Sequence, residues 1–396
     1  MRVLAVGTFC NTVGFSISFP YLPLIIREMG VSGALETWTG IIVGGFFTIS
    51  FLMAPVWGGL ADHFGRRSMV LRAGLGMGIG FALLGATGEW AWFLAFFVLV
   101  GSCNGYVPAA IALTATNTPM RHMGKALSNV QGGALLGTTF GPAAGAFLAT
   151  TLPAYRHLFW VSALMSLLAG AIALIWVREN HQRPQEAFRL TVLADSRTIL
   201  KVPKLGLLFF ISFVFSITMF GSTTVTALYT LDMAGDPATL GAFSLETWVG
   251  VATLALTISS ALALPLWGRG LDRFEPTRVL ALSLMTGALA MWLFPFVRNP
   301  LELTGARLLL GLFAVGIQPA AVRLIKGWAP AGMDARTLAL GTALQMLGNG
   351  AAPFIAGLIG PWLGLRAYFA FNALMLLTAL LLWWRRGLSG MGKAAA

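Results

Sequence analysis

The chain contains two related copies of one segment, and this repeat is the feature that most constrains its fold. Residues 35–64 read LETWTGIIVGGFFTISFLMAPVWGGLADHF, and residues 245–274, which lie 210 positions later, read LETWVGVATLALTISSALALPLWGRGLDRF. Twelve of the thirty positions are identical, and no gap is needed to align them. The sequence therefore predicts two related halves, an arrangement that many secondary transporters build around a site near the bilayer midplane.

Composition places the chain in a membrane. Hydrophobic residues make up 57% of it and charged residues 10%, whereas a soluble domain carries about 25% charged residues. A helix needs about 20 apolar residues to cross a bilayer. We expect twelve such helices near residues 3–26, 38–60, 69–88, 90–114, 124–150, 157–177, 204–230, 243–267, 278–297, 302–325, 334–361 and 364–384.

These segments predict an all-α membrane protein of twelve transmembrane helices in two pseudo-symmetric six-helix bundles. The longest polar stretch separates the two sets of six helices. We expect an N-terminal bundle over residues 1–178, a cytoplasmic linker over 179–203 and a C-terminal bundle over 204–396.

The net charge of +12 follows the expected topology. With the N-terminus inside, twenty-one of the 26 lysines and arginines fall on cytoplasmic edges, as the positive-inside rule requires. We therefore predict a multi-pass protein of the inner (plasma) membrane with both termini in the cytoplasm, no cleaved signal peptide and no nucleic-acid partner.

Little in the sequence favours an enzyme or a cofactor site. The two cysteines lie in apolar runs, and the four histidines lack ligand spacing, so we expect no metal site. The phosphate-binding loop of ATPases and the common hydrolase motifs are not found. We expect a monomer without a cofactor, because two six-helix bundles can enclose a site by themselves.

A glycine-broken turn with one acid and two bases follows the second predicted helix. It reads GGLADHFGRR over residues 58–67 and resembles the G-x-L-A-D-R-x-G-R-K signature of the major facilitator superfamily. The resemblance implies a latch that closes the cytoplasmic side, in which Asp62 faces a helix dipole and the arginines hold carboxylates. The gating residues are Gly58, Asp62, Gly65, Arg66 and Arg67. A short basic loop that only obeys the charge rule is the simpler alternative.

The fifth predicted helix places Gly137, Gly141 and Gly145 on one face, next to Pro142. Small residues at this spacing permit close helix packing, but the added Gly-Pro pair resembles the antiporter motif of drug:proton antiporters in the same superfamily. Helix 1 carries the related G-x-x-x-x-x-P-x-x-P pattern over residues 14–23. Together these motifs are most like MdtG-type multidrug efflux proteins, which implies proton-coupled export.

Two departures concern the coupling. Many proton-coupled relatives carry an acid in helix 1 and an arginine early in helix 4, where this chain has Asn11 and Phe97. An arginine appears instead at Arg307, 210 residues after Phe97. Intramembrane arginines are costly and often functional, although Arg307 could also form a structural pair with Glu302. The remaining candidates for carrying protons are Asp62 and Glu302.

The expected substrate is an amphipathic or lipophilic small molecule, because the polar residues available to a central cavity are few and neutral. Core packing and interhelical hydrogen bonds are the alternative for each of them. A lipid or lysolipid translocator of the same fold is the alternative function. The cavity candidates are Asn11, Asn104, Tyr106, Asn129, Gln131, Thr224, Tyr229, Arg307, Gln318, Gln345 and Asn349.

Overall fold

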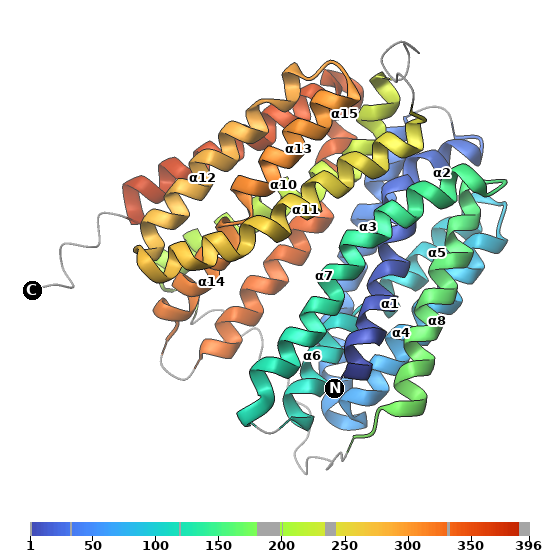
Figure 1. Ribbon diagram of the computed structural model, residues 1–396, viewed down its shortest axis with the longest axis horizontal. Helices are drawn as coiled ribbons and strands as arrows, with labels where there is room; N and C mark the ends of the chain where they lie inside the picture. The colour runs from blue at the N-terminus through green and yellow to red at the C-terminus, as the bar shows by residue number, and fades with distance from the viewer. Residues whose placement is uncertain are drawn as a thin grey trace, which may run out of the picture. The chain divides into compact units, whose positions relative to one another are not determined.

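The computed structural model describes residues 2–31, 34–118, 120–179, 199, 201–233, 243–330 and 333–387. Over these ranges the chain forms helices joined by short connections, which Figure 1 shows as long ribbons. The chain divides into two compact units: residues 1–190 with 244–250, and residues 191–243 with 251–396. Most of the predicted linker, residues 180–198, lies outside the described residues, and the predicted bundle boundaries stay predictions.

In the first unit, α1 packs against α7 and α8, and α4 packs against α8 and α5. These helices lie side by side in Figure 1. The first predicted span is continued beyond α1 by η1 and α2, and the fourth is divided into α5 and α6. The elements are α1 (Arg2–Ser18), η1 (Phe19–Tyr21), α2 (Leu22–Glu28), α3 (Leu35–Phe64), α4 (Arg66–Ala86), α5 (Trp90–Cys103), α6 (Tyr106–Asn117), α7 (Met120–Thr151), η2 (Tyr155–His157) and α8 (Leu158–Trp176).

In the second unit, α10 packs against α15 and α14, and α12 packs against α15 and α13. The last two predicted spans are two helices that meet at Gly364, where the backbone leaves helical geometry (φ +78°), and both carry the label α15. The elements are α10 (Pro203–Met233), α11 (Leu245–Arg273), α12 (Pro276–Trp292), η4 (Phe294–Phe296), α13 (Pro300–Ala314), α14 (Ile317–Trp328) and α15 (Asp334–Gly387).

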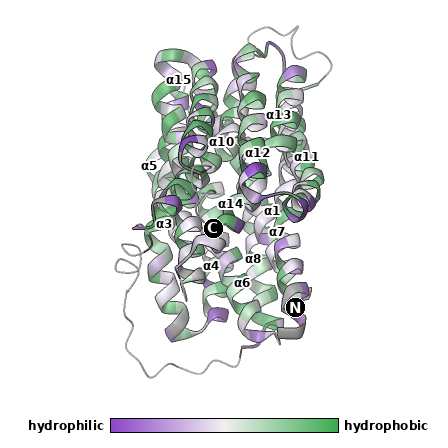
Figure 2. Cartoon of the chain, turned by 90° about the vertical axis from the view of Figure 1, so that its left-hand side faces the viewer, coloured by the Kyte–Doolittle hydropathy of each residue, from purple (hydrophilic) through white to green (hydrophobic). Residues whose placement is uncertain are grey.

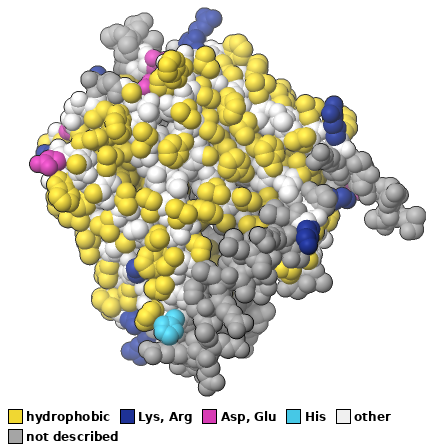
Figure 3. Space-filling model, turned by 180° about the vertical axis from the view of Figure 1, so that it is seen from behind, with side chains coloured by type: hydrophobic (Ala, Val, Ile, Leu, Met, Phe, Trp, Pro, Cys, Tyr) yellow, Lys and Arg dark blue, Asp and Glu magenta, His cyan; other side chains and the backbone are white. Residues whose placement is uncertain are grey.

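The helices carry the apolar surface that a bilayer requires. Among the described residues, 10 helical segments are long and apolar enough to cross a membrane, and one of them, Leu340–Arg385, covers most of the last two predicted spans. Figure 2 shows hydrophobic residues along the helices and hydrophilic ones mainly near their ends. Hydrophobic side chains also cover most of the described surface in Figure 3, with charged side chains toward its margins. The all-α membrane fold is confirmed.

Candidate functional site

The predicted gating motif lies in the turn between α3 and α4. Gly65 adopts φ +88° there, a conformation that glycine reaches without steric cost. The carboxylate of Glu179 accepts hydrogen bonds from the backbone N–H groups of Arg66 (3.0 Å) and Arg67 (2.7 Å). The Arg67 guanidinium donates to the carbonyl oxygen of Leu174 at 2.7 Å. The motif thus ties the start of α4 to the end of α8.

The acid of this motif is seen more clearly in the second copy. Gly58 faces open space. Asp62 lies near the end of α3, and its side chain is outside what the structure describes. Its counterpart Asp272 forms a salt bridge with Arg323 at 3.3 Å, and Arg323 also donates to the carbonyl oxygen of Leu271 at 2.6 Å. The latch role of Asp62 stays a prediction.

The glycines of the predicted antiporter motif lie against the backbone of α1. A Cβ atom added to Gly137 would lie 2.8 Å from the carbonyl oxygen of Phe9. A Cβ atom on Gly141 would lie 2.5 Å from the Cβ of Ser16. Gly145 faces the carbonyl oxygen of Ile17 in the same way. The motif therefore acts first as a close helix contact.

Two further residues extend this contact. Gly133 is one helical turn before Gly137 and packs on the carbonyl oxygen of Ala5. At the other end, the Tyr21 hydroxyl donates to the carbonyl oxygen of Pro142 at 3.0 Å. The sequence pattern of glycines four apart could have identified Gly133, whereas the Tyr21 contact depends on tertiary structure.

Next to the glycine contact, α1 and α7 border a cleft of about 590 Å³. One predicted candidate, Asn129, lines it. Sequence analysis missed the other lining residues, because they are ordinary apolar, small or basic residues until the two helices are placed together. The lining residues are Ala5, Val6 and Phe9 of α1 and Lys125, Ser128, Asn129, Gly132, Gly133 and Leu136 of α7.

Arg307 is fully buried in the second unit, with 0% of its surface exposed. Its Nε donates to the carbonyl oxygen of Ala252 on α11 at 2.7 Å, and one terminal nitrogen donates to the carbonyl oxygen of Ser222 on α10 at 2.5 Å. It also bonds the hydroxyls of Thr226 and Thr223. The guanidinium thus links α13 to α10 and α11 through uncharged oxygens.

The expected pair between Arg307 and Glu302 is not the one that forms. Glu302 lies in the first turn of α13, where its carboxylate accepts from the backbone N–H of Arg298 (2.8 Å) and from the Asn299 side chain (2.8 Å). Asn299 in turn caps the helix by accepting from the backbone N–H of Glu302 at 2.9 Å. This reciprocal cap holds the acid at the helix end, away from the middle of α13.

Acidic residues are confined to helix ends throughout the described helices. Each of them lies within three residues of the first or last residue of its helix. Lysine and arginine, by contrast, also occur well inside helices, as at Arg72, Lys125 and Arg307. In the described helices, the charged residues that lie more than three residues from a helix end are therefore basic.

Three of the four remaining candidates of the first unit contact neighbouring helices. Asn11 is buried and its amide contacts the Met77 sulfur at 3.9 Å. The Asn104 amide donates to the Ser50 hydroxyl at 3.2 Å, and the buried Tyr106 hydroxyl donates to the carbonyl oxygen of Ala169 at 3.1 Å. Gln131 is exposed on α7. The structure thus places three of these four in helix contacts.

The candidates of the second unit lie in several different environments. Thr224 donates to its own helix, and the buried Tyr229 hydroxyl donates to the carbonyl oxygen of Phe294 at 3.0 Å. Gln318 has a buried side-chain oxygen without a hydrogen-bond partner among the described residues. Gln345 and Asn349 are half-buried, one turn apart on α15. A substrate role for these residues stays a prediction.

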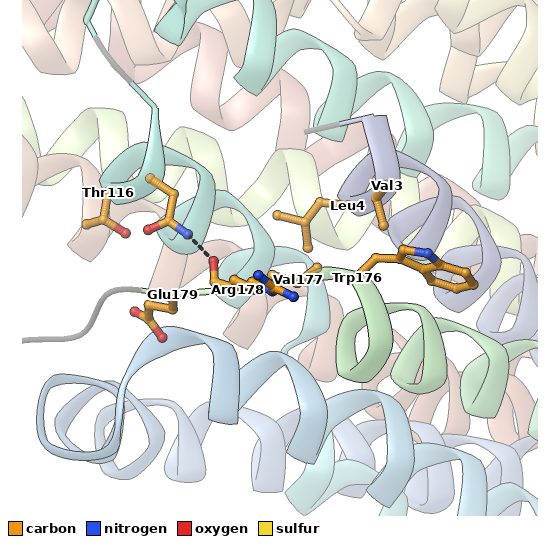
Figure 4. Close-up of a pocket in the computed structure, with 8 residues that line it drawn as sticks. Val3, Leu4, Thr116, Trp176, Val177, Arg178 and Glu179 are labelled. Carbon is orange, nitrogen blue, oxygen red and sulfur yellow. Dashed lines mark hydrogen bonds between the residues drawn. The ribbon is translucent and has the colours of Figure 1, made fainter.

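A second cavity, of about 630 Å³, opens where α1, α6 and α8 meet (Figure 4). Val3, Leu4 and Val177 give it an apolar side, and Asn117 donates across it to the carbonyl oxygen of Arg178 at 2.9 Å. Glu179 also borders it, but its carboxylate binds the start of α4. This cavity is adjacent to the gating motif.

Comparison with known proteins decides the family. The sequence pattern of the Major Facilitator Superfamily matches residues 4–256 and 245–390, which together span nearly the whole chain. The chain belongs to the major facilitator superfamily. It is therefore a membrane transporter with many membrane-spanning helices, and the fold is that of two six-helix halves.

The relatives include multidrug resistance proteins. The chain is 31% identical over 370 residues to the multidrug resistance protein MdtG of Escherichia coli (strain K12 / DH10B), covering 93% of this chain and 89% of MdtG. Two solved structures share the fold: the nucleoside transporter NupG (TM-score 0.81, 11% identity, 97% and 98% coverage) and the human organic anion transporter MFSD10 (TM-score 0.71, 18% identity, 96% and 98% coverage).

Proposed function

We propose that this transporter exports hydrophobic or amphipathic small molecules from the cytoplasm by alternating access, in exchange for protons. The observation that carries this proposal is the 31% identity to MdtG, a multidrug resistance protein, over 93% of the chain. The glycine contact between α1 and α7 supports it, because it lies at the motif that resembles the antiporter signature. We further propose a monomer in the inner membrane with both termini in the cytoplasm.

Proton coupling needs a group that takes up and releases a proton during the cycle. The acids of the described helices lie at helix ends. Glu302 is held in a helix cap, so we favour Asp62, in the gating motif, as the acid that affects coupling. The second copy provides a matched comparison at Asp272, which is paired with Arg323.

Dye accumulation in proteoliposomes tests the function. We expect wild-type protein to move a lipophilic dye faster with an imposed proton gradient than without one, Asp62→Asn to lose this dependence, and Asp272→Asn to retain most of it. A rate of dye movement that is the same with and without the proton gradient would contradict proton coupling. If the protein moves no dye but transports lysolipid, the proposal of drug export is wrong and lipid translocation is the function.

A further inference from the structure

The cleft between α1 and α7 has a charged end and an apolar end. On α7, its lining residues recur at Lys125, Asn129, Gly132 and Leu136, which is the spacing of one helix face. Polar side chains occupy the first part of this face, and glycine and leucine occupy the rest. At 1.5 Å per residue the lining stretches over roughly 16 Å of helix. Its length and polarity suit an amphiphile lying along the helix.

The charge of the cleft determines which head group fits. Among the described residues that line it, Lys125 is the one that carries a charge, and the other polar groups are the Ser128 hydroxyl and the Asn129 amide. These groups can donate hydrogen bonds to an oxyanion. A cationic head would meet the ammonium group of Lys125, and the described lining residues include no carboxylate to offset it.

One residue that lines the cleft, Gly132, faces empty space. A Cβ atom added to Gly132 would find no atom within 4 Å, whereas the neighbouring Gly133 is packed tightly on Ala5. Gly132 therefore contributes empty space to the cleft, and Gly133 contributes to helix packing. A larger side chain at residue 132 can fill the cleft without disturbing the contact between α1 and α7.

The second unit carries the same sign of charge by itself. Arg307 is fully buried among uncharged oxygens, and the acids of the described helices lie at helix ends. A buried positive charge attracts anions and repels cations over distances beyond direct contact. The second unit thus holds a buried charge of the same sign as Lys125 in the first, whatever the arrangement of the two units.

We infer that the cleft between α1 and α7 binds amphiphiles with an anionic head, the head at Lys125 and the tail along Phe9 and Leu136. This inference rests on the proposed export of amphipathic molecules and names their charge class. Lys125 acts as a specificity-determining residue, and Gly132 leaves room for the ligand.

Binding of three matched probes to the full chain in phosphatidylcholine nanodiscs tests the inference. The probes share one dansyl-labelled alkyl chain and end in a carboxylate, a primary amide or a trimethylammonium group. We expect the carboxylate to bind about two- to fivefold more tightly than the amide, the range of an exposed ion pair, and the ammonium to bind most weakly. Added salt should reduce the preference by screening.

Variants separate charge from shape. Lys125→Gln should remove the preference for the carboxylate over the amide probe, and Gly132→Leu should weaken all three probes. Lys326→Gln, which removes an exposed lysine of α14, is the control and should change nothing. Equal binding of the three probes by wild type, or equal weakening of all three by Lys125→Gln, would overturn the inference.

Transport of the same probes in proteoliposomes distinguishes this failure from failure of the proposed function. Transport of the amide and ammonium probes without a charge preference would preserve amphiphile export and overturn the anionic site. Charge-selective binding that depends on Lys125, without transport of any probe, would support the site and contradict the proposed export.

Discussion

Trp57 and Trp267 form equivalent hydrogen bonds in the two halves of the chain. The Trp57 indole donates to the carbonyl oxygen of Ser102 at 2.7 Å, and the Trp267 indole donates to that of Leu312 at 2.8 Å, each acceptor lying 45 residues after its donor. The internal repeat is therefore preserved in tertiary contacts as well as in sequence. Trp57 makes a further contact, because the Arg72 guanidinium lies 3.9 Å from the centroid of its ring.

Replacing either tryptophan by phenylalanine should test this equivalence. Each substitution removes one indole hydrogen bond, which contributes about 0.5–1.5 kcal/mol to stability. Trp57→Phe should cost more than Trp267→Phe, because it also weakens the contact with Arg72, a cation–π interaction of about 0.5–2 kcal/mol. Thermal unfolding in detergent measures both, and a larger loss for Trp267→Phe would contradict the assignment.

Adding one methyl group at Gly141 should separate α1 from α7. The new Cβ would lie 2.5 Å from the Cβ of Ser16 and 3.2 Å from the α1 backbone, so one helix must move. We expect Gly141→Ala to destabilise the protein by about 1–3 kcal/mol and to slow transport. Gly132→Ala, which enters open space on the same helix, is the control for thermal unfolding. Equal stability of the two variants would argue against the glycine contact.

The hydrogen bonds of Arg307 should matter less for stability than the volume it fills. Its hydroxyl acceptors have other bonds, because Thr226 donates to the carbonyl oxygen of Ser222 and Thr223 to that of Met219. An apolar residue of similar length at a buried charge site is often neutral or stabilising. We expect Arg307→Met to unfold within about 1 kcal/mol of wild type, and Arg307→Ala to lose about 2–5 kcal/mol through a cavity.

Unfolding measurements on these two variants decide between volume and charge. If Arg307→Met is as unstable as Arg307→Ala, the guanidinium bonds to α10 and α11 are required for the fold. If both variants match wild type, the site tolerates a cavity and the packing argument is wrong.

Glu179 should stabilise the first turn of α4. Its two oxygens accept from the backbone N–H groups of Arg66 and Arg67, and a carboxylate at a helix N-terminus also interacts favourably with the helix dipole. Glu179→Ala should cost about 1 kcal/mol and increase hydrogen exchange of the amides at residues 66 and 67. Glu302→Ala, which removes the carboxylate half of the reciprocal cap of α13, is the control and should leave those two amides protected. Unchanged exchange in Glu179→Ala would contradict the cap.

Sequence alone determined the membrane class, the two related halves and the family, because hydropathy, the 210-residue offset and the glycine motifs are local or periodic properties of the chain. It also predicted that Gly137, Gly141 and Gly145 share one face of α7, since spacing along a helix predicts which residues share a face. Both results need no knowledge of which helices are neighbours.

Only the tertiary structure decided which groups meet. Sequence proximity favoured Glu302 as the partner of Arg307, but the guanidinium bonds Ala252 and Ser222, which lie 55 and 85 residues away in the chain. Lys125 and Phe9 similarly acquire significance because α1 packs on α7. A buried polar group binds whichever oxygen packing brings within reach, and that packing is set by contacts distant in sequence.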